Sequence, residues 1–162
     1  MTTRDSGVRP PEERRGGRPK ARELVMRTLY ETEITGDDPN EVLALAFGRL
    51  CLTEDGREYA VRLIDAARRH RRKIDNAVSK QLARWDLSRL GAVERSILRL
   101  AAAELIFVRA TPANVVLDEA LRLAHRYGAE GAAGLLNGVL DPLARTERRL
   151  PRKGAGPEES DG

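Results

Sequence analysis

The side chains that could do chemistry in this sequence form no familiar catalytic or metal-binding pattern. His70 and His125 lie far apart and have no ligand residues nearby, so neither predicts a metal site. Cys51 and Ser96 are nucleophile types without a base beside them in the sequence. The glycines match neither a phosphate-binding loop nor a dinucleotide fingerprint. We therefore predict no enzyme, no cofactor and no metal, although folding can still bring two carboxylates together.

Positive charge is the remaining chemical feature, and it is concentrated in two segments. The net charge is +4, but residues 57–84 hold nine Lys and Arg against three Asp and Glu, and residues 1–22 hold seven against three. Residues 23–56, between them, hold two against eight. Such a directed field favours phosphate as a partner. An unevenly charged, solvated surface gives the same pattern, so charge alone leaves both interpretations open.

Composition indicates an intracellular globular chain. Cys51 is the only cysteine, which excludes an internal disulfide and makes a reducing cytosol the default. No apolar stretch approaches the roughly 20 residues that span a bilayer. No apolar run follows the N-terminal Arg and Pro residues, so we expect no secretory signal, no membrane contact and a cytoplasmic location.

The elements that must position these charges are predicted to be helices. Apolar residues recur at helical spacing and no segment alternates as a strand does, which predicts an all-α bundle of about seven helices in two packed halves that meet near Trp85. We expect a flexible basic arm over 1–19, a helical domain over 20–145 and a disordered tail over 146–162. The expected helices cover about 20–34, two segments that begin at 38 and 53, and then about 70–84, 91–109, 112–128 and 130–144.

Some helix ends have clear signals. Asp38 and Thr53 are expected to cap the second and third helices, and Gly36 to end the first. Thr111 is expected to cap the sixth, with Pro112 as its first helical residue. The third and fourth helices meet at His70 without Gly or Pro, so they are either separate or continuous.

Two passages of the sequence resemble the NusB family of transcription antitermination factors, and together they cover about 18–145. The first is an arginine-rich opening that runs into a helix ending in Leu-Tyr. The second is longer and more specific. The matching segments are Arg18-Pro19-Lys20-Ala21-Arg22-Glu23, Thr28-Leu29-Tyr30, Trp85-Asp86-Leu87-Ser88, Val93-Glu94-Arg95, Val115-Val116-Leu117-Asp118-Glu119-Ala120, Tyr127-Gly128-Ala129-Glu130 and Asn137-Gly138-Val139-Leu140-Asp141.

This resemblance implies a function. NusB-like proteins are helical and bind the boxA element of nascent ribosomal RNA transcripts together with NusE, a protein of the small ribosomal subunit. The complex joins RNA polymerase and suppresses premature termination. The resemblance therefore implies an RNA-binding antitermination factor, with boxA RNA, NusE and the polymerase complex as partners.

Resemblance and charge together select candidate RNA-binding residues. Cations supply phosphate contacts, and an aromatic ring supplies a stacking surface for a base of single-stranded RNA. Cations at the start of a helix also oppose its dipole, which makes a purely structural role there less comfortable. The candidates are Arg14, Arg15, Arg18, Lys20 and Arg22 of the arm, Tyr30, and Arg72 and Lys73 of the second basic segment. For the second segment, a solvated helix end is an equally good interpretation.

Glu94 is the candidate partner-binding residue, because the resemblance places a NusE contact at its Val-Glu-Arg motif. An acid in the first turn of a helix is also stabilising by itself. Asn137 is expected to be structural and hydrogen-bonded if buried, and Gly134 and Gly138 to let helices approach closely. Gly131 and Leu135 depart from the family pattern, so we expect less charge and less aromatic stacking there.

Two alternatives compete with an antitermination factor. A NusB-like domain also occurs fused to ribosomal RNA cytosine methyltransferases, but we do not expect such an enzyme here, because 162 residues are too few to add its cofactor-binding α/β domain. The other alternative is a helical adaptor that binds only protein and does not recognise RNA directly.

Overall fold

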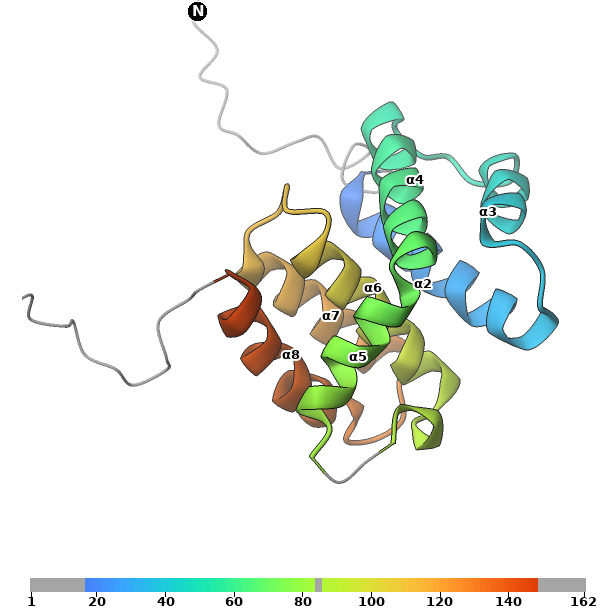
Figure 1. Cartoon of the computed structure of the whole chain (residues 1–162). Helices are drawn as coiled ribbons and strands as arrows, with labels where there is room; N and C mark the ends of the chain where they lie inside the picture. Colours follow the sequence, from blue (N-terminus) through green and yellow to red (C-terminus); the bar gives the residue numbers. More distant parts are fainter. Residues whose placement is uncertain (1–16, 84–85, 149–162) are drawn as a thin grey trace, which may run out of the picture.

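The computed structural model describes residues 17–83 and 86–148, and within these ranges the chain is helical and has no strand (Figure 1). The prediction of an all-α fold is confirmed, and seven α-helices lie in this part of the chain. They are α2 (Arg18–Thr35), α3 (Pro39–Phe47), α4 (Glu54–Arg69), α5 (Arg71–Gln81), α6 (Ala92–Ile106), α7 (Ala113–Tyr127) and α8 (Ala132–Arg148), with a short 3-10 helix η1 (Leu87–Arg89) before α6.

Helix α6 joins the two halves of the bundle. Helices α2, α3 and α4 contact one another on one side, α8 contacts α5 and α7 on the other, and α6 contacts α2, α4, α5, α7 and α8. Ala101 and Ala102 of α6 are buried, and such small side chains let neighbouring helices approach. Both halves therefore share one continuous apolar core. Trp85, where we expected the halves to meet, lies outside the described residues.

Local signals set several helix ends as expected. The Asp38 carboxylate accepts a hydrogen bond from the Asn40 amide at 2.7 Å, and the Thr53 hydroxyl accepts one from the Gly56 amide at 3.0 Å. Each cap satisfies an amide that has no partner within its helix. Gly36 ends α2 with a φ of 78°, a left-handed conformation that glycine adopts without strain.

Two other helix ends are settled by contacts distant in sequence. Helices α4 and α5 are separate, and the His70 ring between them stacks on Phe107 with 3.8 Å between ring centroids. The prediction that Thr111 caps the following helix is wrong. The N-cap of α7 is Pro112, which has no side-chain acceptor and was expected to be the first helical residue, and the Thr111 hydroxyl before it lies 2.8 Å from the Tyr59 hydroxyl.

The helical part of the chain extends slightly past the expected domain bounds. Helix α2 begins at Arg18, so the last two residues of the expected arm are helical, and α8 continues past residue 145 to Arg148. Residues 1–16 and 149–162 lie outside the described part. Among the described helices, none combines the length and the apolar character needed to cross a membrane.

Candidate nucleic-acid interface

The first five residues of α2 include three of the candidate cations, Arg18, Lys20 and Arg22, and the first turn contains no acid. Gly17 precedes the helix without a side-chain cap, and Pro19 fits the first turn because it has no amide hydrogen to satisfy. Cations at this end are unfavourable for the helix by itself. Tertiary partners or a ligand can offset this cost.

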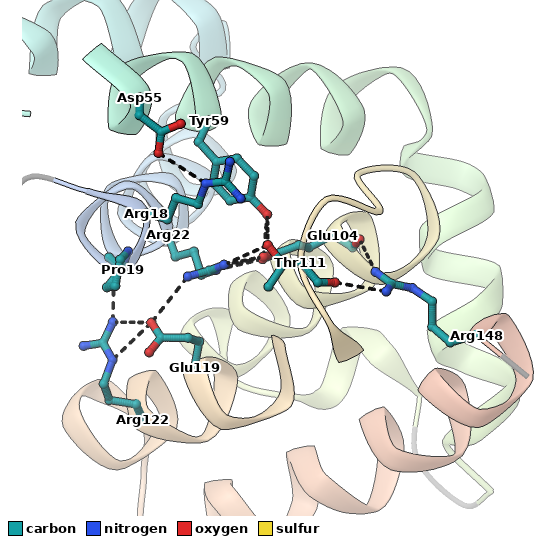
Figure 2. Close-up of polar contacts among 10 residues, drawn as sticks. All are labelled: Arg18, Pro19, Arg22, Asp55, Tyr59, Glu104, Thr111, Glu119, Arg122 and Arg148. Carbon is teal, nitrogen blue, oxygen red and sulfur yellow. Dashed lines mark hydrogen bonds and ion pairs between the residues drawn. The ribbon is translucent and has the colours of Figure 1, made fainter. Parts of the chain in front are cut away.

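Arg22 is stabilised by the protein. Its side chain is 4% exposed, and its Nε donates to both carboxylate oxygens of Glu104 at 2.9 Å (Figure 2). Its Nη2 donates to Glu104 at 2.6 Å and to the Thr111 hydroxyl at 3.3 Å, and its Nη1 lies 3.8 Å from Glu119. Because the side chain is buried and every guanidinium nitrogen has a protein partner, Arg22 is not available to an external phosphate. We therefore remove Arg22 from the candidate interface.

The carboxylate of Glu104 holds this buried network together. The Tyr59 hydroxyl donates to Glu104 at 2.6 Å, so Tyr59, Glu104 and Arg22 bring α4, α6 and α2 to one point. Burial, followed by the charge and hydrogen bond of Glu104, raises the pKa of Tyr59. Burial alone would lower the pKa of Arg22, but its hydrogen bond and charge interaction with Glu104 outweigh this and raise it. The network therefore keeps its charges and fixes α2 on the bundle.

Arg18 and Lys20, by contrast, reach the surface. The Arg18 side chain is 33% exposed, with Nε 3.2 Å from the Asp55 carboxylate and the guanidinium carbon 4.4 Å above the Tyr59 ring centroid. The Lys20 side chain is 32% exposed, with Nζ 3.9 Å from Glu23. Both cations can meet an external anion at the cost of weak surface pairs. Arg14 and Arg15 lie outside the described residues.

Tyr30 lies farther along α2 and is 38% exposed, so its ring is available at the surface. On the same helix, the Glu23 carboxylate is nearly buried and accepts a hydrogen bond from the Tyr127 hydroxyl. Burial would raise the pKa of Glu23, but the Tyr127 hydrogen bond and the charges of Lys20, Arg126 and Arg27 lower it below its usual value. The sequence did not predict this cluster, which consists of Glu23, Tyr127 and the three cations around them.

The second basic segment forms a different surface. Arg72 and Lys73 are exposed in the first turn of α5, beyond the C-terminal end of α4. Arg18, by contrast, pairs with Asp55 near the N-terminal end of α4. At 1.5 Å per residue, α4 separates the two sites by roughly 25 Å. The structure therefore does not bring Arg72 and Lys73 together with the start of α2.

Glu94, the candidate partner contact, is mostly buried, with 8% exposed. Its carboxylate accepts a hydrogen bond from the Ala129 amide at 2.9 Å, in the turn between α7 and α8. A side chain at Gly91 would have to displace this carboxylate. Its direct chemical role in the fold is therefore to hold this turn against the start of α6.

Helix α8 bears on two expectations. Asn137 is exposed, so it leaves no buried amide that must be hydrogen-bonded. A Cβ added at Gly134 or Gly138 would meet nothing within 4 Å, so these glycines do not serve close helix packing.

Within residues 17–83 and 86–148, no group of three or more His, Cys, Asp or Glu side chains could hold a metal ion. The chemistry that the candidate interface offers is therefore that of exposed cations and aromatic rings.

Comparison with known proteins identifies the family. The NusB family model matches residues 19–145. Transcription antitermination protein NusB from Syntrophus aciditrophicus is 34% identical over 123 residues, which are 76% of this chain and 76% of the relative. T. maritima NusB is 32% identical with a TM-score of 0.73, over 82% of this chain and 97% of that one. A chain in the crystal structure of antitermination factors NusB and NusE in complex with dsRNA is 33% identical with a TM-score of 0.72, over 80% of this chain and 96% of that one. The family model covers most of this chain, which therefore belongs to the NusB family.

Proposed function

We propose that this protein is a non-catalytic, cytoplasmic, RNA-binding transcription antitermination factor. It binds boxA of nascent ribosomal RNA transcripts together with NusE, and within the RNA polymerase complex it suppresses premature termination. Family membership supports this function, and a related chain has been solved with NusE and double-stranded RNA.

The observation that carries the proposal is the exposed cationic start of α2. Arg18 and Lys20 are held at the surface by weak pairs, and the ring of Tyr30 is exposed on the same helix. Cations bind phosphate and aromatic rings stack on unpaired bases, so α2 offers both contacts that single-stranded RNA needs. Arg14 and Arg15, which precede α2 in sequence, are proposed to extend this contact.

Arg72 and Lys73 are proposed as a second phosphate-binding surface. Because α4 separates them from the start of α2, they would contact a different part of the RNA. Their removal should therefore weaken binding independently of the α2 cations.

We also propose that Glu94 supports NusE binding through the turn that it holds, since its own carboxylate is mostly buried. Loss of that hydrogen bond would move Ala129 and its neighbours at the surface. The effect on NusE would then follow from the shape of the turn rather than from a lost ion pair.

The proposal is tested by titrating fluorescently labelled RNA with the full chain, alone and with purified NusE. The RNAs are single-stranded boxA, a scrambled sequence of the same length, and a boxA duplex. We expect weak, salt-sensitive binding by the chain alone and tighter, boxA-selective binding with NusE, because two linked surfaces act at high effective concentration. A helical adaptor without RNA recognition would leave the affinity of NusE for RNA unchanged.

Matched variants locate the RNA contact. Arg18→Gln with Lys20→Gln, and separately Arg72→Gln with Lys73→Gln, should each reduce the salt slope by about 1.4, at roughly 0.7 per lost phosphate contact. Arg49→Gln with Lys80→Gln removes the same charge from exposed positions outside both surfaces and should leave the slope unchanged. An unchanged slope for either test pair removes that surface from the proposed site.

A further inference from the structure

We propose that the RNA-binding surface continues from α2 onto α7 through four cations, Lys20 and Arg27 of α2 and Arg122 and Arg126 of α7, which we name the α2–α7 strip. The strip binds the phosphate backbone of the RNA beside the start of α2. This inference rests on the proposed function and adds a second helix to its site.

The two helices place these cations in register. The Arg122 guanidinium donates to the Pro19 carbonyl oxygen at 3.4 Å (Figure 2), and its Nη2 also pairs with Glu119 at 3.0 Å. Four residues later on α7, Arg126 lies 3.7 Å from the carboxylate of Glu23, which is four residues after Pro19 on α2. Arg122 and Arg126, one turn apart on α7, thus reach two positions that are one turn apart on α2. The α7 cations therefore follow the exposed edge of α2.

The edge of α2 has its own helical spacing. Lys20, Glu23, Arg27 and Tyr30 are separated by three, four and three residues, which places them on one face of a helix. Arg27 is exposed and Tyr30 is 38% exposed. Two cations and an aromatic ring thus share the face that borders α7.

One nearly buried acid holds three of these cations. The Glu23 side chain is 5% exposed and lies 3.9 Å from Lys20 and 3.7 Å from Arg126, and Arg27 reaches it through the Tyr127 hydroxyl at 3.4 Å. Three cations around one carboxylate leave a net charge of +2 at the surface. Mutual repulsion in such a cluster is relieved when a polyanion binds. The buried Arg22 network, in contrast, has two acids, Glu104 and Glu119, around its cation.

The aromatic ring within the cluster favours RNA over other polyanions. The guanidinium carbons of Arg27 and Arg126 lie 5.5 Å and 5.3 Å from the centroid of the Tyr127 ring. Aromatic rings and guanidinium planes both stack on unpaired bases. The strip therefore offers phosphate contacts and stacking surfaces together, as recognition of a single strand requires.

The test compares three double variants of the full chain, titrated with labelled single-stranded boxA RNA over a range of salt concentrations, with and without NusE. Arg27→Gln with Arg126→Gln should lower the salt slope by about 1.4, at roughly 0.7 per lost contact. Arg27→Lys with Arg126→Lys keeps both charges and should restore the slope. Arg49→Gln with Lys80→Gln is the matched control and should behave as the wild type does.

Folding of each variant is checked by circular dichroism. If the glutamine pair unfolds, Arg126→Gln alone replaces it, because the Arg126 side chain is 59% exposed, and the expected reduction is then about 0.7. If a folded variant keeps the wild-type salt slope, or if the slope falls equally in the control pair, the strip is overturned. RNA binding by the wild type in the same titrations would still uphold the proposed function. Absence of RNA binding by the wild type, with NusE present, overturns both.

Discussion

Arg22 and Glu23 are neighbours in the sequence, yet their charges serve different purposes. Arg22 points into the bundle, where its guanidinium meets Glu104, Thr111 and Glu119. Glu23 lies under the surface and has three cations around it. The acids around Arg22 neutralise its charge, whereas the cations around Glu23 outnumber it and leave an excess of positive charge. A short basic motif can therefore contain both a residue that fixes the helix and residues that present charge to a ligand.

This difference follows from helical geometry. Consecutive residues on an α-helix point about 100° apart, so one of two adjacent side chains can face the core while the next lies at its edge. Arg22 reaches α6 and the residues before α7, whereas Glu23 reaches the last turn of α7. Substitutions at these positions should consequently affect different properties, namely folding at Arg22 and ligand binding around Glu23.

Replacing Arg22 by Met should cause the largest loss of stability. The change leaves the Glu104 carboxylate buried without its cation, which typically costs about 3–5 kcal/mol of unfolding free energy. Urea denaturation followed by circular dichroism measures this loss. Arg22→Met combined with Glu104→Leu removes both charges and should recover much of it. If the double variant is no more stable than the single one, the unpaired charge is not the cause.

Glu94, like Arg22, is mostly buried, and Glu94→Ala should cause the second largest loss of stability. The substitution removes the acceptor of the Ala129 amide, and a hydrogen bond to a charged group contributes about 1.5–3 kcal/mol. Asp118→Ala, an exposed carboxylate on α7, is the matched control and should change stability by only about 0.5 kcal/mol. Equal effects of the two substitutions in chemical denaturation would place Glu94 among the surface acids.

Replacing Glu23 should cause the smallest loss of stability, and that loss should depend on pH. Its folded-state pKa lies below the usual value of 4.5, so the ionised carboxylate stabilises the folded protein. This stabilisation is complete above pH 4.5 and is lost as the pH falls through the lower folded-state pKa. Glu23→Gln should therefore be less stable than wild type by about 1 kcal/mol near neutral pH. The difference should shrink in acid, and denaturation curves of both proteins from pH 7 to pH 3 measure it. A constant difference contradicts the assignment.

Sequence patterns predicted the features that depend on nearby residues. Helical periodicity predicted the bundle, and the caps at Asp38 and Thr53 were expected because a cap involves residues two or three positions away. Arg18, Lys20 and Tyr30 are at the surface of α2, as an RNA-binding role requires, although their contact with RNA stays a prediction.

Features that depend on distant partners were not predictable in this way. Arg22 looks like its basic neighbours until Glu104, 82 residues later, is placed beside it. Thr111 resembles a cap in the sequence, but its hydroxyl contacts Tyr59 and Arg22 in the folded chain. The cluster around Glu23 had one available signal, the helical spacing of Lys20, Arg27 and Tyr30, but its α7 partners become evident only in the folded chain.

The 82 residues that separate Arg22 from Glu104 in the sequence also determine when α2 can dock on α6 as the chain is synthesised. Chains are made from the N-terminus, and domains fold as the necessary segments become available. When α2 emerges, neither Glu104 nor Thr111 exists, so the guanidinium of Arg22 remains hydrated and the start of α2 has no anchor on α6. Helix α2 can take its final position only after α6 and Thr111 have been made, and closing this long loop should be a late step in folding.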